Sequence, residues 1–227
     1  APDSVTFDSK QGMINSDLRI GADVTVAVPL KANNKLASRG VQLMGNGFIL
    51  SPEEAEKLGS VPSKDVPRFR SGKSGDANVI FDYRNGRDLA ARPRGVKVID
   101  LYGLTEAEAR DQHPAVYQHV LSNVKPHRAQ NNRASYRENW WIYGEARSEM
   151  RKAMAGIDRY FATIETSKHR VFQFLPIGIV PDNMLVCSAL SDAFWLGVMS
   201  SRIHVVWALA SGARLGMGDD PRYTKSR

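Results

Sequence analysis

RYFATIETSKHRVFQFLPIGIVPDNMLVCSAL, residues 159–190, contains three apolar runs of strand length. They are RYFATIET (159–166), HRVFQFLP (169–176) and NMLVCSAL (183–190), and we interpret them as three consecutive strands. Elsewhere in the chain, strand and helix patterns are mixed without a regular alternation, which argues against a doubly wound parallel sheet. We therefore predict an α+β fold, with a mixed, largely antiparallel sheet flanked by helices.

Four further segments carry strand patterns, because β-branched residues alternate there or because turn-forming residues bound them. They are DVTVAVPL (23–30), GVQLMGNGFIL (40–50), NVIFDY (78–83) and VKVIDLYG (96–103). Within the second segment, a Gly-Asn-Gly turn would join two short strands, and the third would enter a turn at Asn85-Gly86. We expect residues 60–78 to form a polar loop.

Two capping boxes, each a Ser or Thr followed three residues later by Glu, predict helix starts. They are Ser51 with Glu54, and Thr105 with Glu108. The first helix should end at Gly59, and the second should run to about residue 130 with a break at Pro114.

Two later helices are also predicted. Residues 147–156 form a short amphipathic pattern closed by Gly156. Residues 200–212 should form a helix that is capped by Ser200 or Ser201 and stops at Gly212. Its apolar spacing predicts that it buries Ile203, Val206, Trp207 and Ala210.

The charge balance is the most informative property of the composition. Among 227 residues, 31 are Lys or Arg and 24 are Asp or Glu, which gives a net charge of +7 and a pI near 9.6. Such basicity is typical of nucleic-acid-binding domains, although many basic proteins bind none. The single cysteine, Cys187, lies in an apolar run, is expected to be buried in a strand, and fits a reducing cytoplasm. No run reaches the roughly 18 apolar residues of a membrane span, so no membrane partner is expected.

Sequence motifs for catalysis are absent from this chain. It has no P-loop, dinucleotide-binding glycine motif, zinc-protease His-Glu pair or nucleophile elbow, and its five histidines are scattered. The acids Asp82, Asp88 and Asp100 lack the lysine spacing of a nuclease site, so we interpret them as solvated or capping residues. We therefore predict no catalytic residue and no metal site.

Two polar clusters are better suited to binding. Residues 125–152 are rich in cations, interleaved with amides and hydroxyls that suit phosphates and base edges. The cations are Lys125, Arg128, Arg133, Arg137, Arg147, Arg151 and Lys152. The second cluster, ETSKHR (165–170), lies between two predicted strands, where a loop would project its side chains together. A solvated protein surface is the alternative interpretation of both clusters.

Four blocks in order resemble the target-recognition region of the MmeI-like class of DNA methyltransferases, which are type IIG restriction–modification enzymes and their relatives. They are NGRDLAARPRGVKVIDLYGLTEAEAR, VKPHRAQNNRASYRENWWIYGE, RYFATIETSKHRVFQFLP, and LGVMSSRIHVVWALASGARLG with DPRYTKS. The resemblance spans Leu18 to the C-terminus. It implies a connector at 1–20 and a target-recognition domain at 21–227, a fragment of a longer chain.

The resemblance also implies the partners. The family methylates adenine with S-adenosylmethionine, but its cofactor loop and Asn-Pro-Pro-Tyr motif do not occur here. We thus expect no cofactor in this fragment and S-adenosylmethionine in the parent protein. Double-stranded DNA and the methyltransferase domain of the same parent chain are the expected partners, in a bacterial cytoplasm.

Site residues follow from the same resemblance. The expected base-reading residues are Thr166, Ser167, Lys168, His169 and Arg170, assisted by Ser135 and Tyr136. The expected phosphate-binding residues are Lys125, Arg128, Arg133, Arg137 and Asn139. Trp140 and Trp141 are expected to anchor this surface to the core rather than to stack on bases, because a duplex offers them no unstacked base. A general RNA- or DNA-binding domain and a stand-alone nuclease remain the alternatives.

Overall fold

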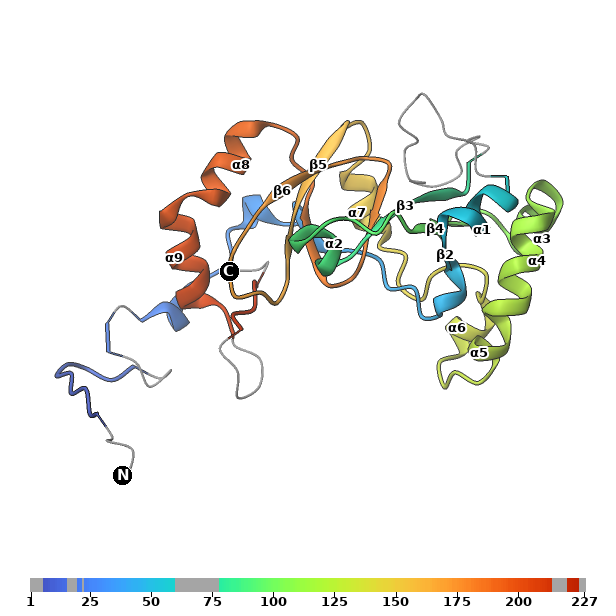
Figure 1. The fold of residues 1–227 in the computed structure, drawn as a ribbon. Coiled ribbons are helices and arrows are strands. Elements are labelled where there is room, and N and C mark those ends of the chain that lie inside the picture. Colours follow the sequence, from blue (N-terminus) through green and yellow to red (C-terminus); the bar gives the residue numbers. More distant parts are fainter. Residues whose placement is uncertain (1–5, 16–19, 22, 60–77, 214–219, 225–227) are drawn as a thin grey trace, which may run out of the picture.

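The computed structural model describes residues 6–15, 20–21, 23–59, 78–213 and 220–224, and its strands form two four-stranded sheets (Figure 1). The first sheet has the order β1 (Ala37–Arg39), β8 (Leu185–Ser188), β5 (Arg159–Ile164) and β6 (Gln173–Pro176). The second has the order β2 (Ile49–Leu50), β4 (Lys97–Ile99), β3 (Ile80–Arg84) and β7 (Ile179–Pro181). All neighbours are antiparallel except β3 and β7. With the helices around them, the sheets confirm the predicted α+β fold.

Each of the three runs in residues 159–190 forms a strand, as predicted. In β5, Phe161 lies opposite Phe174 of β6, and Ala162 lies opposite Cys187 of β8. The short strand β7, between β6 and β8, was not predicted. It belongs to the second sheet, where it pairs with β3, so the chain passes from the first sheet to the second and back here. Side chains from both sheets pack in one core.

Helices lie at both ends of the molecule (Figure 1). α8 and α9 cover the end formed by β5 and β6, and α3 to α6 lie at the other end beside β2 and β4. The α-helices are α1 (Pro52–Lys57), α2 (Gly86–Ala90), α3 (Glu106–Gln112), α4 (Pro114–Asn123), α5 (Lys125–Ala129), α6 (Ala134–Glu138), α7 (Ser148–Ala153), α8 (Ala193–Ser200) and α9 (Arg202–Ser211). The described residues also contain the short 3-10 helices η1 (Val24–Val26), η2 (Lys31–Asn33) and η3 (Asn46–Phe48).

Most of the predicted helix boundaries are confirmed. Both predicted capping boxes are present, at the starts of α1 and α3. Pro114 begins α4, so the predicted helix break is confirmed. Ser201 caps α9 by accepting a hydrogen bond from the His204 amide, and α9 ends before Gly212.

Three predicted backbone features were wrong. Residues 23–30 do not form a strand, because no neighbouring strand lies beside them within the described residues; they contain η1 instead. Residues 40–50 do not form a hairpin. Gly47 does not form a turn between two strands but packs closely against the end of α4, where a Cβ atom would lie 2.6 Å from the Asn123 carbonyl oxygen. Asn85 does not begin a turn; it caps α2 by accepting from the Arg87 and Asp88 amides. The predicted loop at 60–78 lies outside the described residues except for Asn78.

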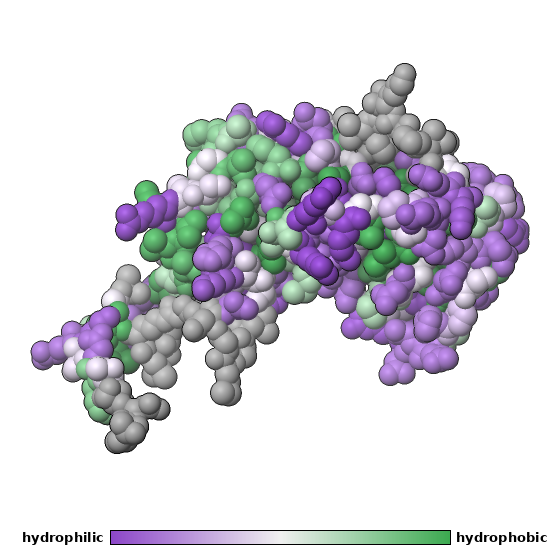
Figure 2. All heavy atoms as spheres, in the orientation of Figure 1, coloured by the Kyte–Doolittle hydropathy of each residue, from purple (hydrophilic) through white to green (hydrophobic). Residues whose placement is uncertain are grey.

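The predicted burial along the last helix was also wrong. Ile203 is 85% exposed, and Val206 and Trp207 are exposed as well, while Ala210 is half-buried. The preceding helix α8, which was not predicted, exposes Phe194, Trp195 and Val198. Figure 2 shows an apolar patch over α8 and α9, where these residues lie, whereas the other end of the molecule is largely hydrophilic in this view. We call Phe194, Trp195, Val198, Ile203, Val206 and Trp207 the apolar α8–α9 face.

Asp88 holds the segment between β3 and β4 in place. Its carboxylate accepts hydrogen bonds from the Asn85 amide and from the amide and guanidinium of Arg94, at 2.9–3.0 Å. Burial by itself would raise the pKa of this carboxyl, but Arg94 and the backbone amides outweigh it and lower the pKa to about 2. The interpretation of Asp88 as a capping acid is thereby confirmed.

Because the pKa of Asp88 is lowered in the folded state, the unfolded chain binds the extra proton first as pH falls. We expect about 2 kcal/mol of unfolding free energy to be lost between about pH 5 and pH 2 through this group. Asp88→Asn should lower the free energy of unfolding by a similar amount at pH 7. It should also make the free energy of unfolding depend less on pH below about pH 5, the acid limb of the stability curve. Urea unfolding at a series of pH values measures both effects. Asp82→Asn is the control, because Asp82 pairs with Lys97 at a half-exposed site. An unchanged acid limb in Asp88→Asn would contradict the assignment.

Candidate nucleic-acid interface

The predicted base-reading loop does connect two strands. It spans residues 165–172, between β5 and β6, and its first residue, Glu165, is buried. The Glu165 carboxylate accepts hydrogen bonds from the guanidinium groups of Arg39 in β1 and Arg222 near the C-terminus. The Tyr223 amide donates to the Glu165 carbonyl oxygen at 2.7 Å, and the Ser167 amide donates to that of Pro221. The C-terminal segment therefore fastens the base of the loop.

Three side chains of this loop are exposed, namely Lys168, His169 and Val171. The Ser167 hydroxyl donates to the His169 carbonyl oxygen at 3.0 Å, and the Thr166 backbone forms a β-bridge with Arg222. Lys168 and His169 are thus the polar loop side chains that could reach a ligand.

The predicted base-reading role of Arg170 does not fit its position. Its guanidinium donates to the carbonyl oxygens of Ile164 and Pro221 and lies 5.0 Å from the Tyr223 ring centroid. Burial lowers the pKa of this guanidinium from its usual value. Arg170 therefore binds the C-terminal segment to the loop and has few donors left for a base.

Arg128 was wrongly predicted to bind phosphate. The side chain is 1% exposed, and its guanidinium donates to the carbonyl oxygens of Leu43, Ile142 and Tyr136. An arginine surrounded by protein carbonyls cannot also reach a DNA backbone. Burial lowers the pKa of this group as well.

The other predicted phosphate-binding residues are exposed. Lys125 lies over the Trp140 ring, with its Nζ 4.8 Å from the centroid. Arg137 donates to the Asn131 carbonyl oxygen at 2.7 Å, and Asn139 donates to that of Ser135. Arg133 donates to the Tyr136 hydroxyl at 2.8 Å and remains 68% exposed. These four side chains are placed where a phosphate could be bound.

Ser135 and Tyr136 have different surroundings. Ser135 is exposed at the start of α6, as a base reader must be. Tyr136 is buried, and its hydroxyl donates to the Glu145 carboxylate at 3.0 Å. The base-reading prediction therefore does not fit Tyr136, whose ring supports Arg128 and Arg133 from 5.3 and 5.2 Å.

The two tryptophans anchor this surface as predicted. Trp140 is buried and packs against Tyr117 and Trp141. The Trp141 indole nitrogen donates to the Leu104 carbonyl oxygen at 3.0 Å. Both rings therefore fix α6 to the core and are not free to stack on bases.

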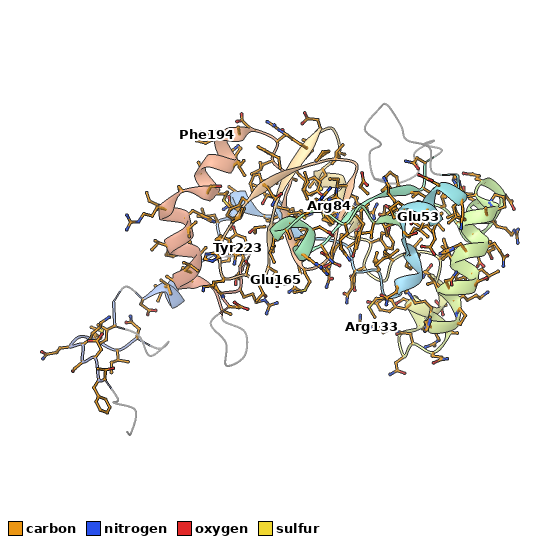
Figure 3. All side chains as sticks on the ribbon, viewed as in Figure 1. Glu53, Arg84, Arg133, Glu165, Phe194 and Tyr223 are labelled. Atoms are coloured by element: carbon orange, nitrogen blue, oxygen red, sulfur yellow. The ribbon has the colours of Figure 1, made fainter. Side chains whose placement is uncertain are left out.

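A hollow of about 460 Å³ lies beside α6 and was not predicted from the sequence. It opens to solvent between α6, the loop before it and the segment after β1. We call it the amide pocket, lined by Gln42, Met44, Gln130, Asn131, Asn132, Arg133 and Tyr136. In the view of Figure 3, Arg133 beside this pocket and Glu165 at the base of the 165–172 loop both lie along the lower side of the molecule.

Within the described ranges, no group of three His, Cys, Asp or Glu side chains is arranged to hold a metal ion. Of the helices that the structure describes, none is by itself long and apolar enough to cross a membrane. α8 and α9 reach that length and hydrophobicity as a pair, bent by 58°.

No protein-family model matches the chain, and no curated protein matches it significantly. Its fold is similar to part of the type IIL restriction–modification enzyme MmeI, whose structure was solved in complex with DNA. The TM-score is 0.67 at 18% sequence identity, and the match covers 94% of this chain. It covers 27% of the MmeI chain, so this chain spans about a quarter of that length. The similarity extends over nearly the whole described architecture and is one of fold.

Proposed function

We propose that this chain is a sequence-specific duplex-DNA recognition module of an S-adenosylmethionine-dependent adenine-N6 DNA methyltransferase, in a restriction–modification system. The observation that carries the proposal is the fold similarity, over 94% of the chain, to one part of an enzyme solved in complex with DNA. The net charge of +7 supports the same partner, since a basic domain is attracted to the phosphate backbone.

Two regions contact DNA in this proposal. The first contacts phosphates and sets the orientation of the duplex, through the exposed side chains around α5 and α6, namely Lys125, Arg133, Arg137 and Asn139. Lys168 and His169, on the 165–172 loop, contact base edges in the major groove, where a lysine ammonium can donate to guanine O6 and N7. The bonds from Arg170, Arg222 and Tyr223 tie that loop to residues 221–223, and base reading favours a loop that is held in place.

The methyltransferase domain of a longer parent chain is the second proposed partner. The apolar α8–α9 face is its proposed docking surface, because large apolar patches on a domain usually mark an interface. S-adenosylmethionine would bind to that other domain, and the parent enzyme would act in a bacterial cytoplasm, where its DNA substrate lies.

Binding of the chain to short duplexes tests the first part of the proposal. We expect sequence-dependent binding that weakens steeply with salt, measured by fluorescence anisotropy, because released counterions drive it. Arg137→Ala should weaken binding to all duplexes alike and reduce the salt slope by about one unit. Arg110→Ala is the control, since Arg110 is an exposed arginine on α3 that pairs with Asp111.

Three outcomes would contradict the proposal. Equal affinity for all duplexes and for RNA would indicate a general nucleic-acid-binding domain. Cleavage of the duplex by the chain with a divalent cation would indicate a nuclease. The absence of binding at low salt would exclude both forms of recognition.

A further inference from the structure

The amide pocket has a floor that the protein holds in one arrangement. The buried Tyr136 ring forms part of it, with its hydroxyl between Arg133 and Glu145. Met44 adopts a left-handed backbone conformation with φ +55°, and its side chain packs against Gly144. A Cβ atom at Gly144 would lie 2.5 Å from the Met44 Cγ and 3.2 Å from the Tyr136 ring. The floor therefore depends on a glycine at this position.

The walls of the pocket carry amides with unused hydrogen-bonding capacity. Within the described part of the chain, the side chains of Gln42, Gln130 and Asn132 donate and accept no hydrogen bond. The Asn131 oxygen accepts from the Arg133 amide at 2.9 Å, which fixes the loop and leaves the Asn131 nitrogen as a donor. Unused amides side by side in one hollow suit a ligand that presents both donors and acceptors.

The lining of the pocket is mostly uncharged. Arg133 is its only cation among the lining residues, and the Glu145 carboxylate, 3.9 Å from Arg133 Nη1, also lies 3.8 Å from Arg147 Nη1. Arg133 therefore keeps a positive charge for a backbone phosphate, and the amides are the groups that would contact a neutral part of the ligand. A phosphate would need donors alone, whereas three of the lining side chains also present amide oxygens.

The lining of the pocket favours a base that is already stacked in a duplex. Tyr136 is the only aromatic lining residue, and its ring is buried. A free base or a single-stranded one would therefore find no ring on which to stack. A duplex base needs no such platform, since its neighbours stack on it.

From these observations we infer that the amide pocket reads the major-groove edge of an adenine. Asn and Gln amides match adenine because their oxygen accepts from N6 while their nitrogen donates to N7. Gln130 and Asn132, on the loop before α6, are the exposed amides that carry this contact, and Gln42 is the half-buried one behind them. The inference rests on the proposed function and adds a second specificity site to the 165–172 loop.

Selection from a randomised duplex pool tests the inference. The wild-type chain should enrich adenine at one position that Gln130→Ala or Asn132→Ala no longer enriches, with the other positions unchanged. Loss of a bidentate amide contact should reduce the preference at that position roughly 5- to 150-fold. Gln118→Ala is the matched control, because Gln118 is an exposed amide on α4 that bonds only Ser122 among the described residues.

An atom-level measurement complements the selection. Placing 7-deaza-adenine at the enriched position removes N7, so it should weaken wild-type binding but cost the pocket variants nothing further. Variants that keep the adenine preference, or a wild type indifferent to the analogue at every adenine, would overturn the inference while leaving the proposed function standing. A wild type that binds no duplex at all would overturn both.

Discussion

Replacing Asp100 with alanine is expected to lower the free energy of unfolding by about 3–5 kcal/mol. Asp100 and Arg151 are both buried, and Arg151 Nη1 donates to the carboxylate at 2.7 Å. The Arg151 guanidinium also lies 4.5 Å from the Tyr102 ring centroid and donates from Nε to the Ala146 carbonyl oxygen. Removing the carboxylate would take away the charge that Asp100 places against a buried cation, which is the costly part of breaking such a pair.

Thermal and urea unfolding would measure this loss, as a fall in the melting temperature of roughly 6–20 °C for a chain of this size. The double variant Asp100→Leu with Arg151→Met should be more stable than Asp100→Ala, because it removes both charges together. Asp111→Ala is the control at an exposed pair with Arg110, and should change stability by less than about 1 kcal/mol. A loss in Asp100→Ala no greater than that of the control would show that the buried pair is not needed.

The parts of the fold that were predictable depend on residues that lie close together in the sequence. A capping box needs only two residues three positions apart, so Ser51 and Thr105 were recognised from the sequence. A strand buried on both faces, such as β8, shows as a continuous apolar run. These features need no knowledge of what lies across from them.

The missed features depend on distant partners. The valines at 23–30 alternate as in a strand, but a strand forms only where another strand offers hydrogen bonds. β7 was missed because three residues, Ile179–Pro181, carry almost no pattern, and pairing with β3 defines them. Asn85-Gly86 fits a turn as well as a helix cap, and Asp88 three residues later was the signal that would have separated the two.

The candidate site was predictable as a region but not residue by residue. Composition marks residues 125–152 as basic, yet it cannot separate the buried Arg128 and Arg151 from the exposed Arg133 and Arg137. Both buried arginines bind groups remote in sequence: the Leu43 carbonyl in one case and Asp100 in the other. Asp100, interpreted from the sequence as a solvated or capping acid, is buried for the same reason. No sequence signal indicated that Gln42 would line the same pocket as Gln130 and Asn132.

Glu165 links the stability of the fold to the position of the 165–172 loop. Its carboxylate is buried between Arg39 and Arg222, both of which keep part of their hydration. Glu165→Ala should therefore cost less than a fully buried pair, about 2–3 kcal/mol. It should also loosen the link between residues 221–224 and the 165–172 loop, because the Arg222 guanidinium would lose its carboxylate partner while the backbone bonds remain.

A loosened loop should recognise DNA less selectively even when the chain is folded. At 15 °C, where Glu165→Ala remains folded, we expect faster amide hydrogen exchange in residues 165–172 and a discrimination between preferred and random duplexes reduced by about 1–3 kcal/mol. Lys168→Ala should lose a similar discrimination without any change in stability or exchange, because Lys168 is exposed and its side chain forms no hydrogen bond or ion pair with the other described residues. Glu165→Gln should lie between the wild type and Glu165→Ala, since it keeps the shape and an acceptor oxygen but not the charge. Unchanged exchange and unchanged discrimination in Glu165→Ala would mean that the C-terminal segment does not position this loop.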